Sequence, residues 1–543
     1  MPSEPFEAEF VYPPALSPDQ EEEYRQLDRE GPLTSPLSRH STHGTATYVG
    51  TGDDIVNVKS LEKERKNEGY HIVTFEEGKH ENPREWGMGR KWFITLATSF
   101  LCLAVAIGSS IATGDIAGPT RDLHIQQEIT NLTVTCFVMG FGLGPLFLAP
   151  LSEVFGRRPI YCISLFLYFI FTLPSALAKN AATLVVARMI AGLAASAPMC
   201  NVGGTIADVW EIENRGAPMA IFSGTIFLGP CIGPMIGGWI GQRAGWRWLY
   251  WVLFIFVGCS FIFTLFMPET LAPVLLRRKA AKLRKDTGDD KYRTLEELEK
   301  KPFAQTIKIA LIRPFIMIFT EPIIIFMSIY LSFVYSLLYL LFFAFPIAFA
   351  EIRGFGLGMT GITFVSIMIG IIIALAMVPV QEKVYTNATR DGSFPEARLY
   401  PMMLGAPILP IALFIFAWTG AYAHVHWMGP IMSGVIFGFA MILLYVSANS
   451  YIIDSYSSYA ASAIAAKTLM RSEIGAMVPL FVTPMFHNMG FQWAGFLLAM
   501  LSVLIGPIPF VFYIYGGRIR ARSQKASKAQ RGSGDHEKAD IGH

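Results

Sequence analysis

The sequence predicts an all-α membrane protein with twelve transmembrane helices in two bundles of six. Three observations support this prediction. Of the 543 residues, 52% are hydrophobic and only 16% are charged, with a mean hydropathy of +0.41, which is too apolar for an ordinary soluble protein. Apolar segments long enough to cross a bilayer, about 20 residues each, recur along the chain. One long polar segment divides them into six and six.

The predicted spans share this length and lie at 91–114, 127–150, 159–178, 182–206, 217–241, 247–267, 315–345, 357–379, 400–421, 428–452, 470–489 and 493–516. They predict two six-helix bundles, 91–267 and 315–516, joined by a cytoplasmic central loop, 268–314. Residues 1–90 have mixed charge, Pro, Ser and Thr and no apolar period, which predicts a disordered tail. Residues 517–543 form a second tail.

The distribution of cations predicts the orientation. Lys and Arg gather in the central loop and in the loops on the same side, and short cytoplasmic loops carry this excess. Both tails are therefore expected in the cytoplasm, in a multi-pass protein of the plasma membrane. No cleaved signal peptide is predicted before the first span. Acids balance the basic central loop, so we expect contact with anionic lipid and not with nucleic acid.

A short repeat relates the two halves. Pro150 and Glu153 follow the second span, and Pro379 and Glu382 follow the eighth, with the same Pro-x-x-Glu spacing. Parallel repeats are typical of secondary transporters, which bind substrate between their halves. The chain has no G-x-x-x-x-G-K-[ST] loop for ATP, and its cysteines lack metal-ligand spacing. We therefore expect that the protein is not an enzyme and has no cofactor or metal. We expect that it has a small-molecule substrate and functions as a monomer.

Several segments resemble one family. "LAPLSEVFGRRP" (148–159) is similar to the loop 2–3 signature of the major facilitator superfamily, and "LVVARMIAGLAA" (184–195) to its fourth-span signature. Residues 224–238 resemble the fifth-span signature of its drug:proton antiporters. Over about residues 85–520 the chain is similar to fungal twelve-span drug:H+ antiporters, which include polyamine and azole exporters.

This resemblance implies a proton-coupled secondary transporter that exports a small amphipathic molecule by alternating access. A drug, a polyamine, an organic acid or a secondary metabolite would each fit as substrate. Two alternatives stay open, namely a proton-coupled importer on the same fold and a non-transporting membrane receptor.

The resemblance also implies a cytoplasmic gate that latches the outward-facing state. Glu153, Arg157 and Arg158 lie in the loop after the second span, and Asp208 ends the fourth span on the same side. Ordinary positive-inside topology would account for the two arginines, but not for the two acids.

The fifth span contains an unusual set of helix breakers and small residues: Gly224, Gly229, Pro230, Gly233, Pro234, Gly237 and Gly238. Three of the glycines recur every four residues, so they share one helix face and allow a neighbouring backbone to approach closely. The prolines each remove a helix hydrogen bond, which favours a bend. Tight packing alone would explain the pattern. The resemblance implies that this face is also a hinge and a seal against ion leak.

Charged residues within spans are the strongest indication of function, because each costs about 2.5–3.5 kcal/mol at a helix centre. Glu321 is predicted about two turns above the inner surface and is the first candidate for proton carriage. Asp115, at the outer end of the first span, is the second. Arg188 cannot titrate, but it can tune a neighbouring carboxylate. A static hydrogen bond beside Pro322 is the alternative for Glu321, and an interfacial cap is the alternative for Asp115.

A cavity for amphipathic substrates is expected to be mostly aromatic with few polar groups. Tyr335 and Tyr339 share a face of the seventh span, and Asn201 and Asn449 offer neutral hydrogen bonds in the fourth and tenth spans. Asp454 and Arg471 flank the inner ends of the tenth and eleventh spans, which predicts a salt bridge.

Overall fold

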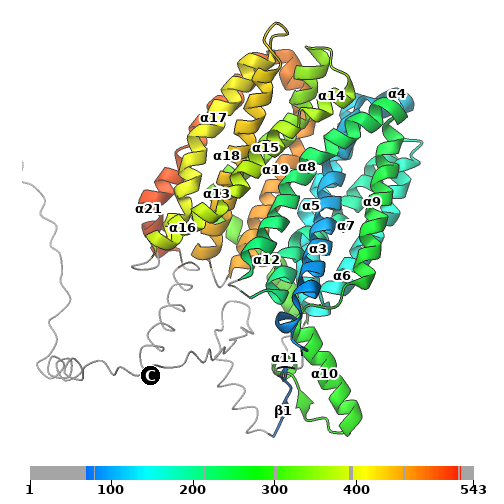
Figure 1. Ribbon diagram of the computed structural model, residues 1–543, viewed down its shortest axis with the longest axis vertical. Helices are drawn as coiled ribbons and strands as arrows, with labels where there is room; N and C mark the ends of the chain where they lie inside the picture. Colours follow the sequence, from blue (N-terminus) through cyan, green and yellow to red (C-terminus); the bar gives the residue numbers. More distant parts are fainter. Residues whose placement is uncertain are drawn as a thin grey trace, which may run out of the picture. The chain divides into compact units, whose positions relative to one another are not determined.

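Eleven helices in the described part of the chain are long and apolar enough to cross a membrane, which confirms the predicted all-α membrane class. The computed structural model describes residues 69–76, 78, 80–211, 214–298, 303–389, 395–456, 459–523 and 526. These residues all belong to the unit Tyr48–His543. Figure 1 shows the helices running side by side in two groups.

The first group contains the helices of the N-terminal bundle. They are α3 (Met88–Ser110) with the 3₁₀ turn η2 (Ile111–Asp115), α5 (Gln127–Phe155), α6 (Arg157–Ala176), α7 (Ala181–Val209), α8 (Gly216–Ala244) and α9 (Trp246–Phe266). The short α4 (Ala117–Leu123) connects η2 to α5 at the outer end. Here the inner side is the one predicted to face the cytoplasm, and the outer side is the opposite one.

The second group contains the helices of the C-terminal bundle. They are α13 (Pro322–Pro346) with the π turn η4 (Ile347–Glu351), α14 (Leu357–Ile362), α15 (Val365–Ala376), α16 (Val378–Ala388), η5 (Pro395–Leu399), α17 (Tyr400–Gly420), α18 (Met428–Ser455), α19 (Ala460–Met489), α20 (Phe491–Ile505) and α21 (Ile508–Arg522). Helices α14, α15 and α16 together make the eighth span, and α20 and α21 make the last.

Helix α19 is eleventh in chain order and brings the spanning helices of the described residues to twelve. Its sequence is less apolar than those of the other eleven. It carries Lys467, Arg471 and Glu473. It packs against α13 of its own bundle and α5 of the other bundle, so most of these charges are removed from lipid. It begins at Ala460, whereas the predicted span began at 470, at the start of the apolar run. Hydropathy missed the first turns because a helix whose polar residues face inward has a low mean hydropathy.

The two bundles meet along two lines of contact. Helix α5 packs against α19, and α8 packs against α14 and α15. On the first line, Asn131 Nδ2 donates a hydrogen bond to the carbonyl oxygen of Pro479 over 2.9 Å. On the second, a Cβ added at Gly238 would collide with the Leu357 carbonyl. Both close contacts lie in the outer halves of the helices, so the outer side of the interface is closed.

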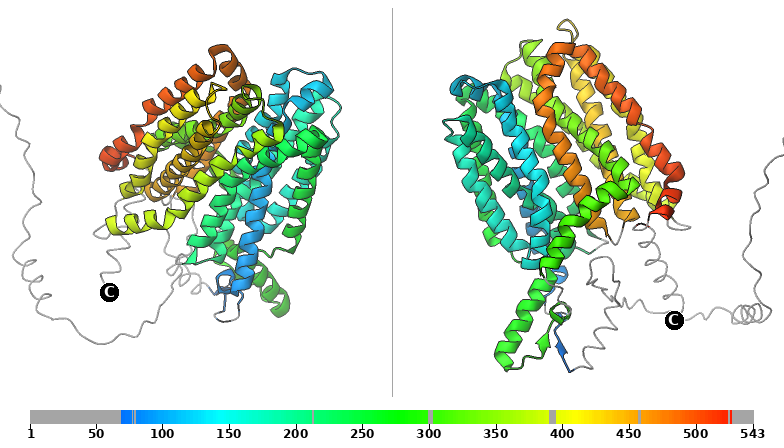
Figure 2. Two further views of the ribbon diagram at one scale, coloured as in Figure 1. Left: turned by 45° about the horizontal axis from the view of Figure 1, so that its top comes forward. Right: turned by 180° about the vertical axis from the view of Figure 1, so that it is seen from behind.

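The central segment contains more regular structure than the predicted polar loop. It holds α10 (Ala272–Thr287), β2 (Tyr292–Arg293), α11 (Leu295–Leu298) and α12 (Phe303–Thr320). Helix α12 contacts α5 and α19, so it joins the inner ends of both bundles, as Figure 2 shows from behind. The seventh span starts at Pro322 and not at 315, because proline at the first helical turn needs no backbone donor and starts a new helix.

The prediction of a disordered tail over residues 1–90 is wrong for its described end. Strand β1 (His71–Ile72) pairs in parallel with β2, and a 3₁₀ turn, η1 (Pro83–Glu85), precedes α3. The Asn82 side chain accepts a hydrogen bond from the Arg84 amide at the start of that turn. Residues 1–68 lie outside the described part of the chain, as do most residues after 523.

Candidate functional site

The inner end of the N-terminal bundle contains part of the predicted gate. Arg157 Nε lies 3.5 Å from Asp208 Oδ2, which joins the start of α6 to the end of α7. Arg157 Nη1 also donates to Ser152 Oγ over 2.6 Å. Arg158 is directed elsewhere and donates to the Leu265 carbonyl oxygen over 2.9 Å. Glu153 is exposed and makes no ion pair with a described residue.

The structure places Asn201, which was predicted as a cavity residue, in this inner cluster. Its Oδ1 accepts hydrogen bonds from Ser152 Oγ, over 2.8 Å, and from Arg157 Nη1, over 3.4 Å. The acceptor that was expected to bind substrate is therefore occupied by Ser152 and Arg157. Sequence alone places Asn201 in the fourth span, but not at the depth and rotation that bring it to Arg157.

Glu269, which the sequence analysis missed, holds the start of α6. Its carboxylate accepts the backbone amides of Arg157 over 2.9 Å and Arg158 over 3.2 Å. It thereby satisfies two amides that a helix start leaves without partners, and it places negative charge at the positive end of the helix dipole. Gly156 has a φ of +106°, and a Cβ there would collide with this carboxylate. The signal was the acid in "PETLAP", directly after the sixth span.

The inner end of the C-terminal bundle has a matching ion pair, which corrects the predicted bridge between Asp454 and Arg471. Arg398 Nε lies 2.9 Å from Asp454 Oδ2, and Arg398 Nη1 lies 2.8 Å from Glu382 Oε1. In both halves an arginine at or just before the start of one helix pairs with an aspartate near the end of the next, so the same kind of pair occurs in both bundles. Arg471 lies inside α19, away from the loop where the bridge was expected.

The glycines of α8 pack closely against neighbouring backbone. Added Cβ atoms at Gly229 and Gly233 would collide with Ala106 and Ser110 of α3, and one at Gly237 would lie 2.6 Å from the Ile111 carbonyl oxygen. These three glycines therefore let α8 approach the first span. Gly224 differs, because its nearest neighbour would be a methyl group of Leu375 of α15 at 3.6 Å. Helix α8 continues through Pro230 and Pro234 without interruption, from Gly216 to Ala244.

Glu321 is not inside the seventh span, so the predicted position is wrong. It is the residue before α13, where the chain turns out of α12. Its Oε2 accepts hydrogen bonds from the Tyr456 hydroxyl, over 3.0 Å, and from the Ser523 hydroxyl. Glu321 is 4% exposed and joins three segments at the inner side, which matches the static role that was its alternative.

The other two predicted charges are buried within the N-terminal bundle. Arg188 donates to the backbone carbonyls of Gly108 over 2.7 Å and Thr133 over 3.3 Å, and its guanidinium lies 4.1 Å from the centre of the Phe137 ring. It pairs with no described carboxylate, so the neighbour it was expected to tune is absent from this part of the chain. Asp115 is 3% exposed and lies 3.6 Å from the exposed Arg121.

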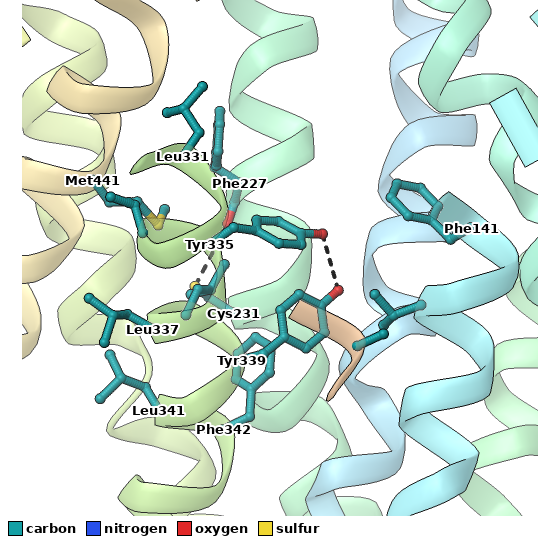
Figure 3. Packing of buried hydrophobic residues seen from close by; sticks show 14 of the residues in the cluster. Phe141, Phe227, Cys231, Leu331, Tyr335, Leu337, Tyr339, Leu341, Phe342 and Met441 are labelled. Atoms are coloured by element: carbon teal, nitrogen blue, oxygen red, sulfur yellow. Dashed lines mark hydrogen bonds between the residues drawn. The ribbon is translucent and has the colours of Figure 1, made fainter. Parts of the chain in front are cut away.

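The predicted tyrosines lie in the middle of the molecule, beside the interface. Figure 3 shows Tyr335 and Tyr339 on α13 with their hydroxyls directed at each other, Phe227 and Cys231 of α8 nearby, and Phe141 opposite. The two hydroxyl oxygens are 3.3 Å apart. Both rings are buried, so they contribute to the packed centre and not to the lipid-facing surface.

Two cations of α19 extend this central cluster. Arg471 lies over the Tyr335 ring, 4.1 Å from its centre, and donates to the Tyr445 hydroxyl. Lys467 donates to Asn449 Oδ1 over 2.7 Å and to Tyr445 over 3.2 Å. Asn449, predicted as a cavity residue, is therefore the partner of a buried ammonium. Lys467 lies before the predicted span 470–489, because hydropathy began that span too late.

Glu473 is a further residue that sequence reasoning missed. It is half-buried on α19 where this helix meets α5, and a Cβ added at Gly142 of α5 would lie 2.7 Å from its Oε1. That oxygen is buried and has no hydrogen-bond partner among the described residues. The signal was available, because Glu473 lies within the predicted span 470–489 and an acid inside a span indicates function.

An apolar groove of about 680 Å³ lies away from this centre, between α3 and α9. It is lined by Phe93, Leu96, Phe100, Ile255, Phe256 and Phe263, among others. Several of these side chains are exposed on the outside of the bundle, and none offers a polar anchor. The groove therefore has the character of a lipid-facing surface.

Two bundles of six helices, with charged side chains of α19 that form no ion pair in the described part of the chain, are the architecture of a membrane transport protein and not of an enzyme. The chain belongs to the major facilitator superfamily, whose family model matches residues 92–479. Among solved structures, the inward-open xylose transporter XylE from E. coli has a TM-score of 0.58 at 16% identity, covering 78% of this chain and 96% of that one. That likeness concerns the fold.

Curated relatives are much more similar in sequence. The MFS-type transporter paaT of Penicillium rubens is 44% identical, over 91% of this chain and 89% of the relative. The multidrug transporter mdrA of Aspergillus fumigatus is 40% identical, over 84% and 76%. Polyamine transporter 3 of Saccharomyces cerevisiae is 39% identical, over 84% and 73%. The chain is therefore a multi-pass transporter related to fungal multidrug and polyamine transporters.

Proposed function

We propose that this transporter is a proton-coupled exporter of a small amphipathic molecule, located in the plasma membrane with both termini in the cytoplasm. Other relatives in fungi are named efflux pumps, at 40% identity, which supports the export direction. A 100 mV potential contributes about 2.3 kcal/mol per proton, and each tenfold gradient costs about 1.4 kcal/mol. One proton therefore sustains roughly a fortyfold gradient of a neutral substrate.

The position of Glu473 is the observation on which the coupling proposal rests. A carboxyl that couples proton movement to helix movement must lie where the bundles separate, and it must lack a permanent partner. Glu473 lies at the contact of α19 with α5, and its buried oxygen has no described partner. Separation of these helices would hydrate the carboxyl and favour its charged form, whereas contact would favour its protonated form. Glu321, held by two hydroxyls outside the span, does not have these properties.

Three other features complete the proposed cycle. Asp115, buried at the outer closure, is the second candidate proton site, and the fixed charge of Arg188 stays within the N-terminal bundle. The pair of Arg157 with Asp208, at the inner end of the N-terminal bundle, is the cytoplasmic gate. The Gly229, Gly233 and Gly237 face of α8 is the hinge and seal.

The test compares Glu473→Gln with Glu128→Gln in inside-out membrane vesicles. Glu128 is exposed in the first turn of α5 and offers a matched loss of one acid. Uptake of labelled spermidine and of 2-naphthoate is measured with an imposed pH gradient and with a protonophore. Exchange of internal for external substrate is measured without a gradient.

We expect Glu473→Gln to lose gradient-driven uptake at least tenfold while exchange continues, and Glu128→Gln and Glu321→Gln to keep both activities. Gradient-driven uptake at the wild-type rate in Glu473→Gln would refute the assignment. Uptake of substrate into right-side-out vesicles, driven by a higher proton concentration outside the vesicles than inside, would instead identify an importer.

A further inference from the structure

Two buried cations lie on one face of α19. Lys467 and Arg471 are four residues apart, which places them one above the other on the helix. They are 2% and 3% exposed. No carboxylate in the described part of the chain lies within 4 Å of either side-chain cation. Like charges at this spacing destabilise a helix, so this part of α19 carries an uncompensated cost.

The acceptors around the pair are neutral. The Tyr445 hydroxyl accepts hydrogen bonds from both cations, and Asn449 Oδ1 accepts one from Lys467. Arg471 Nε is buried without a partner among the described residues. A buried charge is costly unless it is paired with an opposite charge and fully hydrogen-bonded, and here two charges share one phenolic oxygen. Both requirements would be met by a bound anion.

Glu473 is too far around the helix to serve as the counter-ion. It follows Arg471 by two residues, which corresponds to a rotation of about 200° around an α-helix. Its carboxyl lies beside Gly142 of α5, whereas Arg471 lies over Tyr335 of α13. The charges of α19 are therefore divided between two faces, with cations toward the aromatic centre and the acid toward the other bundle.

Aromatic rings surround the pair and extend to the bundle interface. The Arg471 guanidinium lies 4.1 Å from the centre of the Tyr335 ring, and the Lys467 ammonium lies 4.7 Å from that of Tyr445. Phe227 of α8, in the other bundle, contacts the Tyr445 ring edge-on with the ring centres 4.7 Å apart. The movement that separates α8 from α18 would therefore uncover Tyr445 and the cations behind it.

We propose that Lys467 and Arg471 bind the carboxylate of an organic acid, and that its apolar body packs against Tyr335, Tyr445 and Phe227. This inference rests on the proposed function, because it needs a substrate that passes between the bundles. A guanidinium binds a carboxylate through two parallel hydrogen bonds, and the ammonium adds a second charge. Of the substrate classes left open by the sequence, an organic acid fits this site, and a polyamine would be repelled by it.

The test measures binding to the purified full chain in detergent, without any gradient. The probes are 2-naphthoate, its neutral amide 2-naphthamide, and the cation 2-naphthylmethylamine, which share one fluorescent ring system. We expect 2-naphthoate to bind the wild-type protein at least tenfold more tightly than either of the others. Lys467→Gln and Arg471→Gln should each weaken 2-naphthoate binding at least tenfold and leave 2-naphthamide binding unchanged.

Lys383→Gln is the matched control, because Lys383 is an exposed lysine on α16 and its loss should leave all three affinities unchanged. Arg471→Lys keeps the charge and should retain part of the 2-naphthoate affinity. It provides the test at this position if Arg471→Gln does not fold. Equal affinity for the three probes, tighter binding of the amine, or full 2-naphthoate affinity in Lys467→Gln would overturn the proposal.

The outcomes also separate this site from proton coupling. Binding of 2-naphthoate with no gradient-driven transport would leave the anion site standing and remove the coupling proposal. Gradient-driven transport of spermidine, with no selective binding of 2-naphthoate, would leave the exporter standing and remove the anion site.

Discussion

Replacing Gly237 by alanine tests the close contact between α8 and α3. The added Cβ would lie 2.6 Å from the Ile111 carbonyl oxygen and 3.3 Å from the Gly114 Cα. Ordinary van der Waals contact begins near 3.4 Å, so the two backbones must separate locally by about 0.8 Å. Gly224→Ala is the control on the same helix, because its Cβ would meet Leu375 at 3.6 Å, an ordinary contact.

The expected magnitudes follow from two opposing effects. Inserting a methyl group into a packed site costs about 1–3 kcal/mol. Replacing glycine by alanine inside a helix contributes about 1 kcal/mol of stability, and both variants share this gain. We therefore expect Gly237→Ala to be less stable than Gly224→Ala by about 1–3 kcal/mol. For a bundle of this size, about 2–4 °C of Tm corresponds to each kcal/mol, so a difference of at least 2 °C is expected.

The assay combines thermal unfolding of the purified variants with proton leak and substrate flux in vesicles. Because α8 also contacts α14 through Gly238, a displaced α8 should loosen the outer closure, raise the proton leak and reduce flux in Gly237→Ala. Surface expression must be measured alongside, since a folding defect alone would also reduce flux. Equal Tm, leak and flux in Gly237→Ala and Gly224→Ala would refute the hinge-and-seal reasoning.

Two further predictions concern ion pairs at the two sides of the membrane. Asp208→Asn removes the pair with Arg157 and should shift the protein toward the inward-facing state. A loss of about 1.4 kcal/mol would change the ratio of the two states tenfold. Labelling of a cysteine introduced at the inner end of α19 should then accelerate up to tenfold, and an unchanged rate would count against the latch. At the outer side, the hydrogen bond from the Trp246 indole and the pairing with Arg247 lower the pKa of Asp122 below its usual value. A lowered pKa stabilises the folded state above the unfolded value, about 3.9, and the benefit is lost as the pH falls through the folded pKa. Tm should therefore decline below about pH 4, and less steeply in Asp122→Asn; identical acid limbs in the two proteins would contradict this assignment.

The sequence by itself determined the features that depend on local pattern. Apolar length gave twelve spans in two halves, and charge placement gave their orientation as a prediction. The four-residue spacing of Gly229, Gly233 and Gly237 placed them on one face, and this face contacts α3 in the structure. Arg157 and Asp208 were expected within reach of each other because the two loops lie on the same side, and they are paired. Such features follow from helix geometry and hydropathy, which are read along the chain.

Only the tertiary structure decided which charges lie inside and which of them are paired. Hydropathy placed Glu321 within a span, but the proline after it starts a new helix and leaves the carboxylate at the inner side. The same measure began the eleventh span too late, because the polar side chains of α19 are covered by α5, α13 and α18 and need not be apolar. Asp454 pairs with Arg398 and not with Arg471, because helix rotation and depth determine which side chains meet. These quantities depend on the packing of distant segments, so the sequence pattern alone did not reveal that, among the described residues, Lys467 and Arg471 have no carboxylate partner and Glu473 Oε1 has no hydrogen-bond partner.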